Sequence, residues 1–261
     1  MRKGCLPSSS MPGLLAAMVT IRNIVVLTGA GVSAESGLAT FRAADGLWEG
    51  HRVEDVATPQ AYRRDPRLVH AFYDARRARL GEVQPNTAHR ALARLDAAWP
   101  GGFLLVTQNV DDLHERGGSK RLLHMHGELN RAWCLACAER FGWAGPMGVE
   151  AVCLSCGEPG RVRPDIVWFG EMPYGMDRIS QALAQADLFV SIGTSGAVYP
   201  AAGFVQLAAA HGARTLELNL EPSHGSFLFD ESRTGPASAL VPAWVDGLLE
   251  DAGVAPVEAR P

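Results

Sequence analysis

The sequence predicts an α/β fold: a doubly wound, Rossmann-like parallel sheet that carries a smaller module and a helical insertion. Four short apolar runs are typical of strands buried on both faces, and helical patterns separate them: residues 24–28, 103–107, 188–192 and 215–219. Three of these runs end in Gly, Asn or Ser turns. Because parallel strands present their carboxyl ends at one edge of a sheet, we expect these turns to line a single ligand crevice.

The same patterns divide the chain into units. The Rossmann-like domain is expected in three stretches, interrupted by the helical insertion and by a zinc-ribbon-like module: 20–47, 87–130 and 163–250 for the domain, 48–86 for the insertion and 131–162 for the module. The first eighteen residues have a basic start and an apolar patch that Pro and Ser interrupt, which makes a poor signal peptide. We expect flexible tails at 1–19 and 251–261.

Composition restricts the class of partner. The 261 residues are 47% hydrophobic and carry a formal net charge of −4, so they offer no basic surface for nucleic acid. No run approaches the ~18 apolar residues of a membrane helix. Four of the five cysteines form two C-x-x-C pairs, which points to metal rather than disulfides and hence to a reducing compartment. We therefore expect a cytoplasmic monomer that binds neither nucleic acid nor membrane.

A glycine turn follows the first predicted strand. Gly29, Gly31 and Ala34 fit the G-x-G-x-x-G/A pattern, in which the glycines allow a tight turn and a close approach to a pyrophosphate. A tight turn without a ligand explains the same residues equally well. A standard dinucleotide fold would place an acid on a second strand about 20 residues later. Residues 51–56 instead have the pattern of a loop and a helix start, so the standard hydride-transfer layout is excluded.

Two further segments place polar side chains near the same edge. Residues 108–111, Gln-Asn-Val-Asp, come just past the second predicted strand, although helix capping would also explain the Asn and the Asp. Residues 122–129 predict a short strand in which His124 and His126 point to the same face. A histidine suits general-base catalysis because its pKa lies near neutrality, but a lone histidine is more often structural.

The cysteine pairs predict a structural zinc site. Fifteen residues separate the two pairs, which matches the C-x2-C-x15–20-C-x2-C pattern of Cys134, Cys137, Cys153 and Cys156. Four thiolates fill a tetrahedral site and leave no position for water or substrate, so the metal is expected to be structural. The His-x-His pair could also bind metal, but the cysteines make the better cage. Cys5 is left over.

A predicted helix after Asp65-Pro66 carries Tyr73 and Arg76 three residues apart, and therefore on one face. From spacing alone, a core tyrosine beside a solvated arginine is the more common explanation.

In this order, the motifs resemble those of the sirtuins, which are NAD-dependent protein lysine deacylases. The resemblance runs from about Asn23 to Leu249, and beside the cysteine pairs it rests on residues 29–37, 107–111, 124–127, 193–195 and 219–221. It implies NAD as a consumed cosubstrate, which agrees with the missing second strand and acid. It also implies one structural zinc ion and acyl-lysine proteins or peptides as substrates.

The resemblance further implies a role for each matching residue. His126 is the expected general base: the acyl-lysine carbonyl oxygen attacks the nicotinamide ribose, nicotinamide leaves, and His126 takes a proton from a ribose hydroxyl. The products are free lysine, nicotinamide and 2'-O-acyl-ADP-ribose. The expected NAD-binding residues are Gly29, Ala30, Gly31, Ser33, Ala34, Glu35, Thr40, Phe41, Arg42, Trp48, Gln108, Asn109, Val110, Asp111, Gly193, Thr194, Ser195, Asn219, Leu220, Glu221 and Ala237. The segment Val167, Trp168, Phe169 and Gly170 is expected to pair with the substrate peptide as an added strand would.

Two details bear on the subclass. Tyr73-Asp74-Ala75-Arg76 resembles the Tyr-x-x-Arg of class III-like sirtuins, which remove succinyl and malonyl groups. A phenol and a guanidinium on one helix face can bind a carboxylate at the far end of an acyl chain. The resemblance therefore favours Tyr73 and Arg76 as substrate-binding residues over a core tyrosine beside a solvated arginine. Residues 38–42, Leu-Ala-Thr-Phe-Arg, differ from the Ile-Pro-Asp-Phe-Arg of many sirtuins. The alternatives are an NAD-dependent protein ADP-ribosyltransferase and a non-catalytic module that binds NAD or ADP-ribose.

Overall fold

The computed structural model describes residues 21–39, 47–48 and 50–254, and at its centre lies a six-stranded sheet in the order β11-β10-β9-β1-β4-β5. All neighbouring strands of this sheet are parallel. The strands are β1 (Asn23–Thr28), β4 (Gly102–Thr107), β5 (Leu122–His124), β9 (Leu188–Ile192), β10 (Arg214–Asn219) and β11 (Glu231–Thr234). The predicted doubly wound parallel sheet is confirmed, and β5 and β11 extend it at both edges.

The strand order reverses at β1. The chain passes from β1 to β4 and β5 on one side, then returns to β9, β10 and β11 on the other. Thr28, the last residue of β1, pairs with Thr107 of β4 and with Ile192 of β9. The three central strands therefore end level with one another, and the turns that follow them meet at the switch point where such sheets bind ligands.

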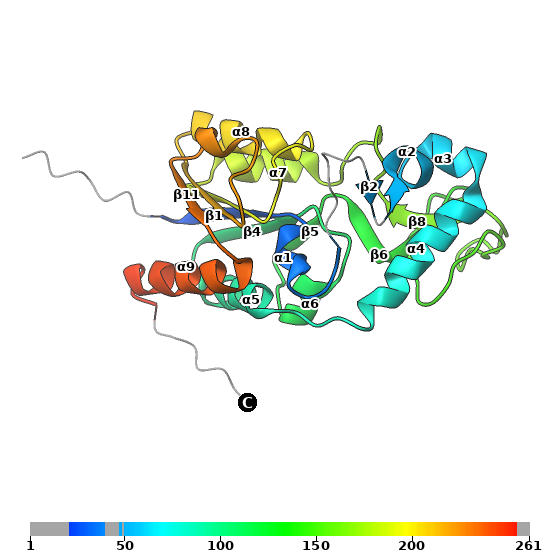
Figure 1. Ribbon diagram of the computed structural model, residues 1–261, viewed down its shortest axis with the longest axis horizontal. Coiled ribbons are helices and arrows are strands. Elements are labelled where there is room, and N and C mark those ends of the chain that lie inside the picture. The colour runs from blue at the N-terminus through cyan, green and yellow to red at the C-terminus, as the bar shows by residue number, and fades with distance from the viewer. Residues whose placement is uncertain (1–20, 40–46, 49, 255–261) are drawn as a thin grey trace, which may run out of the picture.

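Helices cover both faces of the sheet (Figure 1). On one face lie α1 (Gly31–Ala34), α5 (Thr87–Ala98) and α9 (Ala237–Asp251), which share a core with β1, β4, β9 and β10. On the other face α7 (Met176–Ala184) and α8 (Phe204–Ala210) bury the opposite side of β1, β4 and β9. Burial on both faces explains why the central strands are apolar runs without alternation. Among the described residues, no helix combines the length and the apolar character that crossing a membrane requires.

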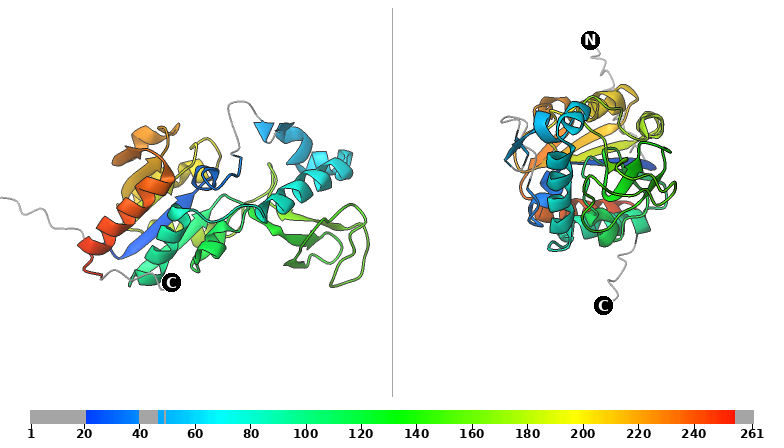
Figure 2. Two further views of the ribbon diagram at one scale, coloured as in Figure 1. Left: turned by 60° about the horizontal axis from the view of Figure 1, so that its bottom comes forward. Right: turned by 90° about the vertical axis from the view of Figure 1, so that its right-hand side faces the viewer.

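A smaller region is attached at the carboxyl edge of the sheet (Figure 2). It contains an antiparallel sheet in the order β7-β6-β8, formed by β6 (Gly127–Cys134), β7 (Arg140–Gly142) and β8 (Val162–Ile166). Beside it lie a hairpin and three helices: β2 (Leu47–Trp48), β3 (His51–Arg52), α2 (Val53–Val56), α3 (Pro59–Arg64) and α4 (Pro66–Leu80). Tyr73 of α4 packs with Leu129 of β6, Ile166 of β8 and Trp168 in one buried cluster.

The expectation of one strand over 122–129 is wrong. The structure breaks this segment after His124, so that β5 belongs to the parallel sheet and β6 to the antiparallel sheet. Gly127 begins β6 at a φ of 82°, and a Cβ there would lie 2.0 Å from the carbonyl oxygen of Asp165. Only glycine fits this turn, and it redirects the chain between the two sheets directly after His126.

Candidate active site

The glycine turn after β1 and the turn after β9 are in direct contact. The Gly31 amide donates to the Gly193 carbonyl at 2.8 Å, and a Cβ on Gly31 would lie 2.7 Å from the Gly193 Cα and carbonyl oxygen. Gly193 has a φ of 61°, in the region that favours glycine. These glycines are therefore required for the two turns to meet. They lie at the carboxyl ends of β1 and β9, where the strand order reverses.

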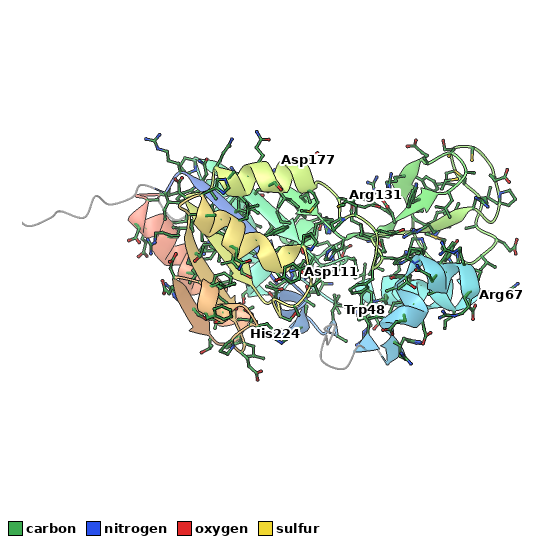
Figure 3. The ribbon with its side chains drawn as sticks, turned by 90° about the horizontal axis from the view of Figure 1, so that it is seen from above. Trp48, Arg67, Asp111, Arg131, Asp177 and His224 are labelled. Atoms are coloured by element: carbon green, nitrogen blue, oxygen red, sulfur yellow. The ribbon has the colours of Figure 1, made fainter. Side chains whose placement is uncertain are left out.

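A buried polar network lies beside these turns. Ser33 donates to the Asp111 carboxylate at 3.1 Å and accepts from the Asn109 amide at 3.1 Å, with all three side chains buried. Burial raises the pKa of Asp111. The structure thus brings together one residue of the glycine turn and two residues that follow β4, all predicted to bind NAD. In Figure 3, Asp111 lies near the middle of the molecule, between the large sheet and Trp48.

His89 and His114 join this network, and the sequence analysis missed both. Their rings are 4.9 Å apart, His89 lies 3.4 Å from the Ser33 hydroxyl, and His114 lies 2.9 Å from the Thr28 hydroxyl. Burial lowers the pKa of His89 to about 4 and that of His114 well below its ordinary value. His89 also completes a capping box with Asn86 at the start of α5, which is the one sequence pattern that could have drawn attention to it.

The imidazole of His126 has a defined tautomer. Its Nδ1 lies 3.1 Å from the Gln108 carbonyl oxygen, which can only accept, so Nδ1 carries the proton and the lone pair is on Nε2. Burial lowers the pKa of His126, although the bond to Gln108 opposes this shift. The ring is therefore neutral at pH 7, as proton abstraction requires.

His124 has the opposite electrostatic setting. Its Nδ1 lies 3.0 Å from the Asn109 carbonyl oxygen, and its Nε2 lies 2.6 Å from the Glu115 carboxylate. Burial would lower the pKa of His124, but the hydrogen bond and charge of Glu115 outweigh it and raise the pKa. Both nitrogens are thus engaged, which leaves His126 as the better base of the pair.

Further residues predicted to bind NAD lie on neighbouring turns. The Asn219 side chain donates to the Thr194 carbonyl at 2.8 Å, and Gln108 donates to the Thr194 hydroxyl at 3.1 Å. Glu35 accepts from the backbone amide of Ser238 at 2.9 Å, next to Ala237 at the start of α9. Leu220 is exposed beyond β10. These residues form a continuous rim from β4 to α9. Thr40, Phe41 and Arg42 lie outside the described residues, as does Cys5.

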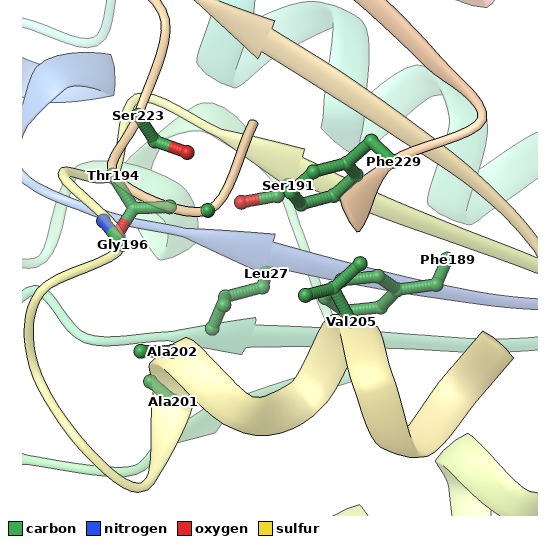
Figure 4. Close-up of a pocket in the computed structure, with 11 residues that line it drawn as sticks. Leu27, Phe189, Ser191, Thr194, Gly196, Ala201, Ala202, Val205, Ser223 and Phe229 are labelled. Atoms are coloured by element: carbon green, nitrogen blue, oxygen red, sulfur yellow. The ribbon is translucent and has the colours of Figure 1, made fainter. Parts of the chain in front are cut away.

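A small cavity opens behind this rim, between the sheet and α8 (Figure 4). Its walls are mostly apolar, with Leu27, Phe189 and Val205 among them. It shares Thr194 alone with the predicted NAD-binding residues. The cavity and the predicted NAD-binding residues therefore meet only at the turn after β9.

Tyr73 and Arg76 face a set of tryptophans. The buried Tyr73 hydroxyl accepts from Trp168 Nε1 at 3.0 Å, and the Arg76 guanidinium carbon lies 4.0 Å from the centre of the Trp48 ring. Burial raises the pKa of Tyr73, against the charge of Arg76, so the phenol keeps its proton. Arg76 is half-buried. Spacing alone favours a core tyrosine beside a solvated arginine. The structure confirms the buried tyrosine, but Arg76 is not fully solvated.

The predicted peptide-binding segment, residues 167–170, connects the backbone of His126 with the cluster around Tyr73. The Val167 amide donates to the His126 carbonyl at 2.9 Å, and Phe169 donates to Ala57 at 2.9 Å. Trp168 is buried under the guanidinium of Arg163, at 3.3 Å from its ring centre, while Phe169 is exposed. The segment thus extends from the backbone of His126 to the buried cluster that contains Tyr73.

The four cysteines form one cluster whose ligand atoms all lie within 4.8 Å of one another. The Sγ atoms of Cys134 and Cys156 are 3.8 Å apart, and those of Cys137 and Cys153 are 3.7 Å apart. A disulfide would need about 2.05 Å, whereas a tetrahedral zinc ion with bonds of about 2.3 Å places its sulfurs about 3.8 Å apart. The cluster fits a structural zinc ion closely.

Comparison with known proteins agrees with this geometry. The profile of the Sir2 family matches residues 29–200. The chain is 58% identical over 231 residues to an NAD-dependent protein deacylase of Bdellovibrio bacteriovorus, covering 88% of this chain and 97% of that protein. It is also 58% identical over 229 residues to an NAD-dependent protein deacylase of Escherichia coli K12, covering 87% and 82%.

Solved structures of Sir2 homologues have the same fold. One bound to NAD matches with a TM-score of 0.80 at 37% identity, covering 88% of this chain and 91% of that chain. Another, bound to 2'-O-acetyl-ADP-ribose, matches with a TM-score of 0.81 at 36% identity, covering 92% and 97%. The chain therefore belongs to the Sir2 family.

Proposed function

We propose that this NAD-dependent protein deacylase uses His126 as its general base and accepts lysine acyl groups that end in a carboxylate, succinyl and malonyl, as well as acetyl. The deacylase activity follows from the chain's close relatives. The arrangement of Tyr73 and Arg76 on one face of α4 carries the acyl preference.

The chemistry proposed for the site assigns one step to His126. The acyl carbonyl oxygen attacks C1' of the nicotinamide ribose, and nicotinamide leaves with the bonding electron pair. Nε2 of His126 accepts the proton of a ribose hydroxyl, whose oxygen then bonds to the acyl carbon. The bond between the acyl carbon and the lysine nitrogen then breaks, and the amine leaves with the proton that His126 took up. Water adds its oxygen to the acyl carbon, and the bond from that carbon to the oxygen on C1' breaks, which leaves a hydroxyl on C1' and the acyl group on the ribose hydroxyl oxygen. NAD, acyl-lysine and water thus give nicotinamide, lysine and acyl-ADP-ribose. The neutral Nε2 lone pair, set by the bond from Nδ1 to Gln108, supports this role.

The proposed NAD site is the rim described above. Gln108, Asn109 and Asp111 are proposed to hold the nicotinamide and its ribose, and the turns after β9 and β10 the adenosine half. The deep network around Asp111 supports this division, because a buried carboxylate with raised pKa is typical of a functional site.

Two contacts prepare Tyr73 and Arg76 for a carboxylate. Because Trp168 Nε1 donates to the Tyr73 oxygen, the hydroxyl hydrogen is available to donate to a ligand. The Arg76 guanidinium lies over the Trp48 ring, and this cation–π contact restricts its position while keeping its charge. Together they offer one neutral and one charged donor, which an acetyl group cannot use.

The test is a side-by-side assay of one peptide carrying acetyl-, malonyl- or succinyl-lysine, with NAD and with nicotinamide release as the readout. We expect release with all three and a higher kcat/KM for the carboxylate-bearing groups. Release without loss of the acyl group, with label from NAD on the protein instead, would indicate ADP-ribosyl transfer. Binding of ADP-ribose without any release would indicate a non-catalytic module. We also propose a monomer, which sedimentation can check.

A further inference from the structure

Helix α4 carries a second pair of side chains that faces away from the acyl pocket. Asp74 and Arg77 are each one position beyond Tyr73 and Arg76, so the two pairs occupy adjacent stripes on the same two turns of the helix. Arg77 Nη1 donates to the Asp74 carboxylate at 2.6 Å, with only 4% of the Arg77 side chain and 17% of the Asp74 side chain exposed. This pair is far more buried than the Arg79–Glu82 pair at the end of the same helix.

The pair binds the loop that leads into the four-cysteine cluster. Asp74 accepts from the backbone amides of Met147 at 2.9 Å and Gly148 at 3.2 Å, one with each carboxylate oxygen. Arg77 donates to the Gly145 carbonyl at 3.3 Å. Loop 145–148 is thus held to α4 by three hydrogen bonds to charged groups, the strong class of protein hydrogen bond.

The same loop is anchored in the core of the cysteine module. Met147 is buried against Cys134 and Cys153 in one apolar cluster. Arg77 Nε also donates to the Leu129 carbonyl of β6 at 2.6 Å, and the Leu129 amide donates to the Val110 carbonyl beside Asp111. The contacts of Asp74 and Arg77 therefore run from the zinc ligands on one side to the turn after β4 on the other.

We propose that Asp74 and Arg77 are positioning residues that couple the four-cysteine module to the acyl pocket, so that the module helps to determine which acyl groups the enzyme accepts. This inference rests on the proposed function. The physical reason is that Tyr73 and Arg76 are fixed on the same two helical turns. A shift of α4 toward or away from loop 145–148 moves the phenol and the guanidinium together, and a bidentate contact to a carboxylate is lost over a small displacement.

The consequence differs between acyl groups. An acetyl group makes no charged contact and tolerates a small displacement of α4, whereas a succinyl group depends on both donors. Loss of the Asp74 contacts should therefore raise the KM for succinyl peptide without changing the KM for NAD. A residue that merely stabilised the fold would affect all substrates alike.

The experiment compares Asp74→Ala and Asp74→Asn with Glu82→Ala. Glu82 pairs with Arg79, at the end of α4, at 2.8 Å and also three residues apart, but both side chains are exposed, which makes it a matched control. For Asp74→Ala we expect the succinyl-peptide KM to rise at least about tenfold, with the acetyl-peptide and NAD KM values within about twofold of wild type. Asp74→Asn, which keeps one acceptor oxygen, should give a smaller rise, and Glu82→Ala none.

Hydrogen exchange of the same three variants gives a readout independent of acyl preference. We expect faster exchange in α4 and loop 145–148 for Asp74→Ala but not for Glu82→Ala. Equal KM changes for the acetyl and succinyl peptides would overturn the coupling, as would an unchanged succinyl KM in a folded Asp74→Ala protein. If wild type removes acetyl but not succinyl or malonyl, the proposed acyl preference fails, and with it the specificity role of the pair. Faster exchange would then show a mechanical contact alone.

Discussion

The imidazole of His126 donates Nδ1–H to the carbonyl oxygen of Gln108 at 3.1 Å, and this bond leaves the lone pair of the neutral ring on Nε2. Gln108 is in turn tied to Thr194 through its own side chain. The proposed base is thus held by the turn after β4, and the Gln108 side chain connects that turn to the turn after β9. The parallel register of the central strands is what brings these two turns together.

The pH profile of kcat/KM should have its acidic limb below pH 6.5. His126 must be neutral to accept a proton, and burial lowers its pKa from the ordinary value near 6.5. Activity is therefore retained as the pH falls past 6.5, and is lost only when the pH reaches the lowered pKa. A limb above 6.5 that disappears in the variant Glu115→Gln would instead assign the titration to the neighbouring His124–Glu115 pair.

Replacement His126→Ala should lower kcat by about 10²- to 10⁴-fold, the usual contribution of a general base. ADP-ribose binding and the thermal midpoint should change little, because the lost side chain is only half-buried. His211→Ala is the matched control: its Nδ1 also bonds a carbonyl, that of Leu207, but on an exposed helix end far along the chain. Near-normal deacylation in His126→Ala would refute the assignment.

Tyr73→Phe and Arg76→Met should reduce desuccinylation more than deacetylation. Each removes one donor to the acyl carboxylate and keeps most of the packing volume, so we expect a selective loss of about 10-fold for the phenol and more for the guanidinium. Tyr73→Phe also leaves Trp168 Nε1 without its acceptor, which lowers stability and makes a thermal melt a necessary control. Equal losses with acetyl and succinyl peptides would contradict the carboxylate pocket.

The elements that the sequence predicts are those whose signal is local. The central strands are apolar because both faces are buried, and the cysteine spacing alone predicts the metal cluster. β11 escaped prediction because its residues are polar and exposed, so it has no apolar pattern, and its parallel pairing with β10 depends on residues far apart in sequence. The break at His126 depends on the close approach of Gly127 to Asp165, a contact between residues far apart in sequence.

The buried contacts of the candidate site have no local sequence pattern that would predict them. His89 and His114 meet only because α5 and α6 (Leu113–Gly117) pack together beside α1, and single histidines in helices carry no pattern of their own. Asp74 and Arg77 look like an ordinary helical ion pair in sequence. Their burial against loop 145–148 is a consequence of how the smaller region folds.

Acid should destabilise the chain through His89 and His114. Burial lowers the pKa of His89 to about 4, whereas in the unfolded chain it titrates near 6.5. Below pH 6.5 the unfolded state therefore binds more protons, and stability falls with pH by up to about 1.4 kcal/mol per unit for each such histidine, or about 3 kcal/mol for His89 by pH 4. Urea unfolding across pH 7 to 4 measures this slope. His89→Gln should flatten it, and an unchanged slope would show that other groups dominate.

Removal of the metal should unfold the cysteine module and leave the parallel sheet intact. We expect one zinc ion per chain, because four thiolates with separations of 3.7 and 3.8 Å make a single closed site. Residues 131–162 have few buried apolar side chains of their own, so metal binding supplies much of their folding free energy. Chelation should therefore raise hydrogen exchange across this segment while β1, β4 and β9 stay protected. Cys153→Ser should have the same effect without chelator.

If zinc were lost with no change in hydrogen exchange, the metal would not be structural. If activity returned on adding a metal ion while the module stayed unfolded, the ion would be acting in the chemistry, which the closed set of four sulfur ligands argues against.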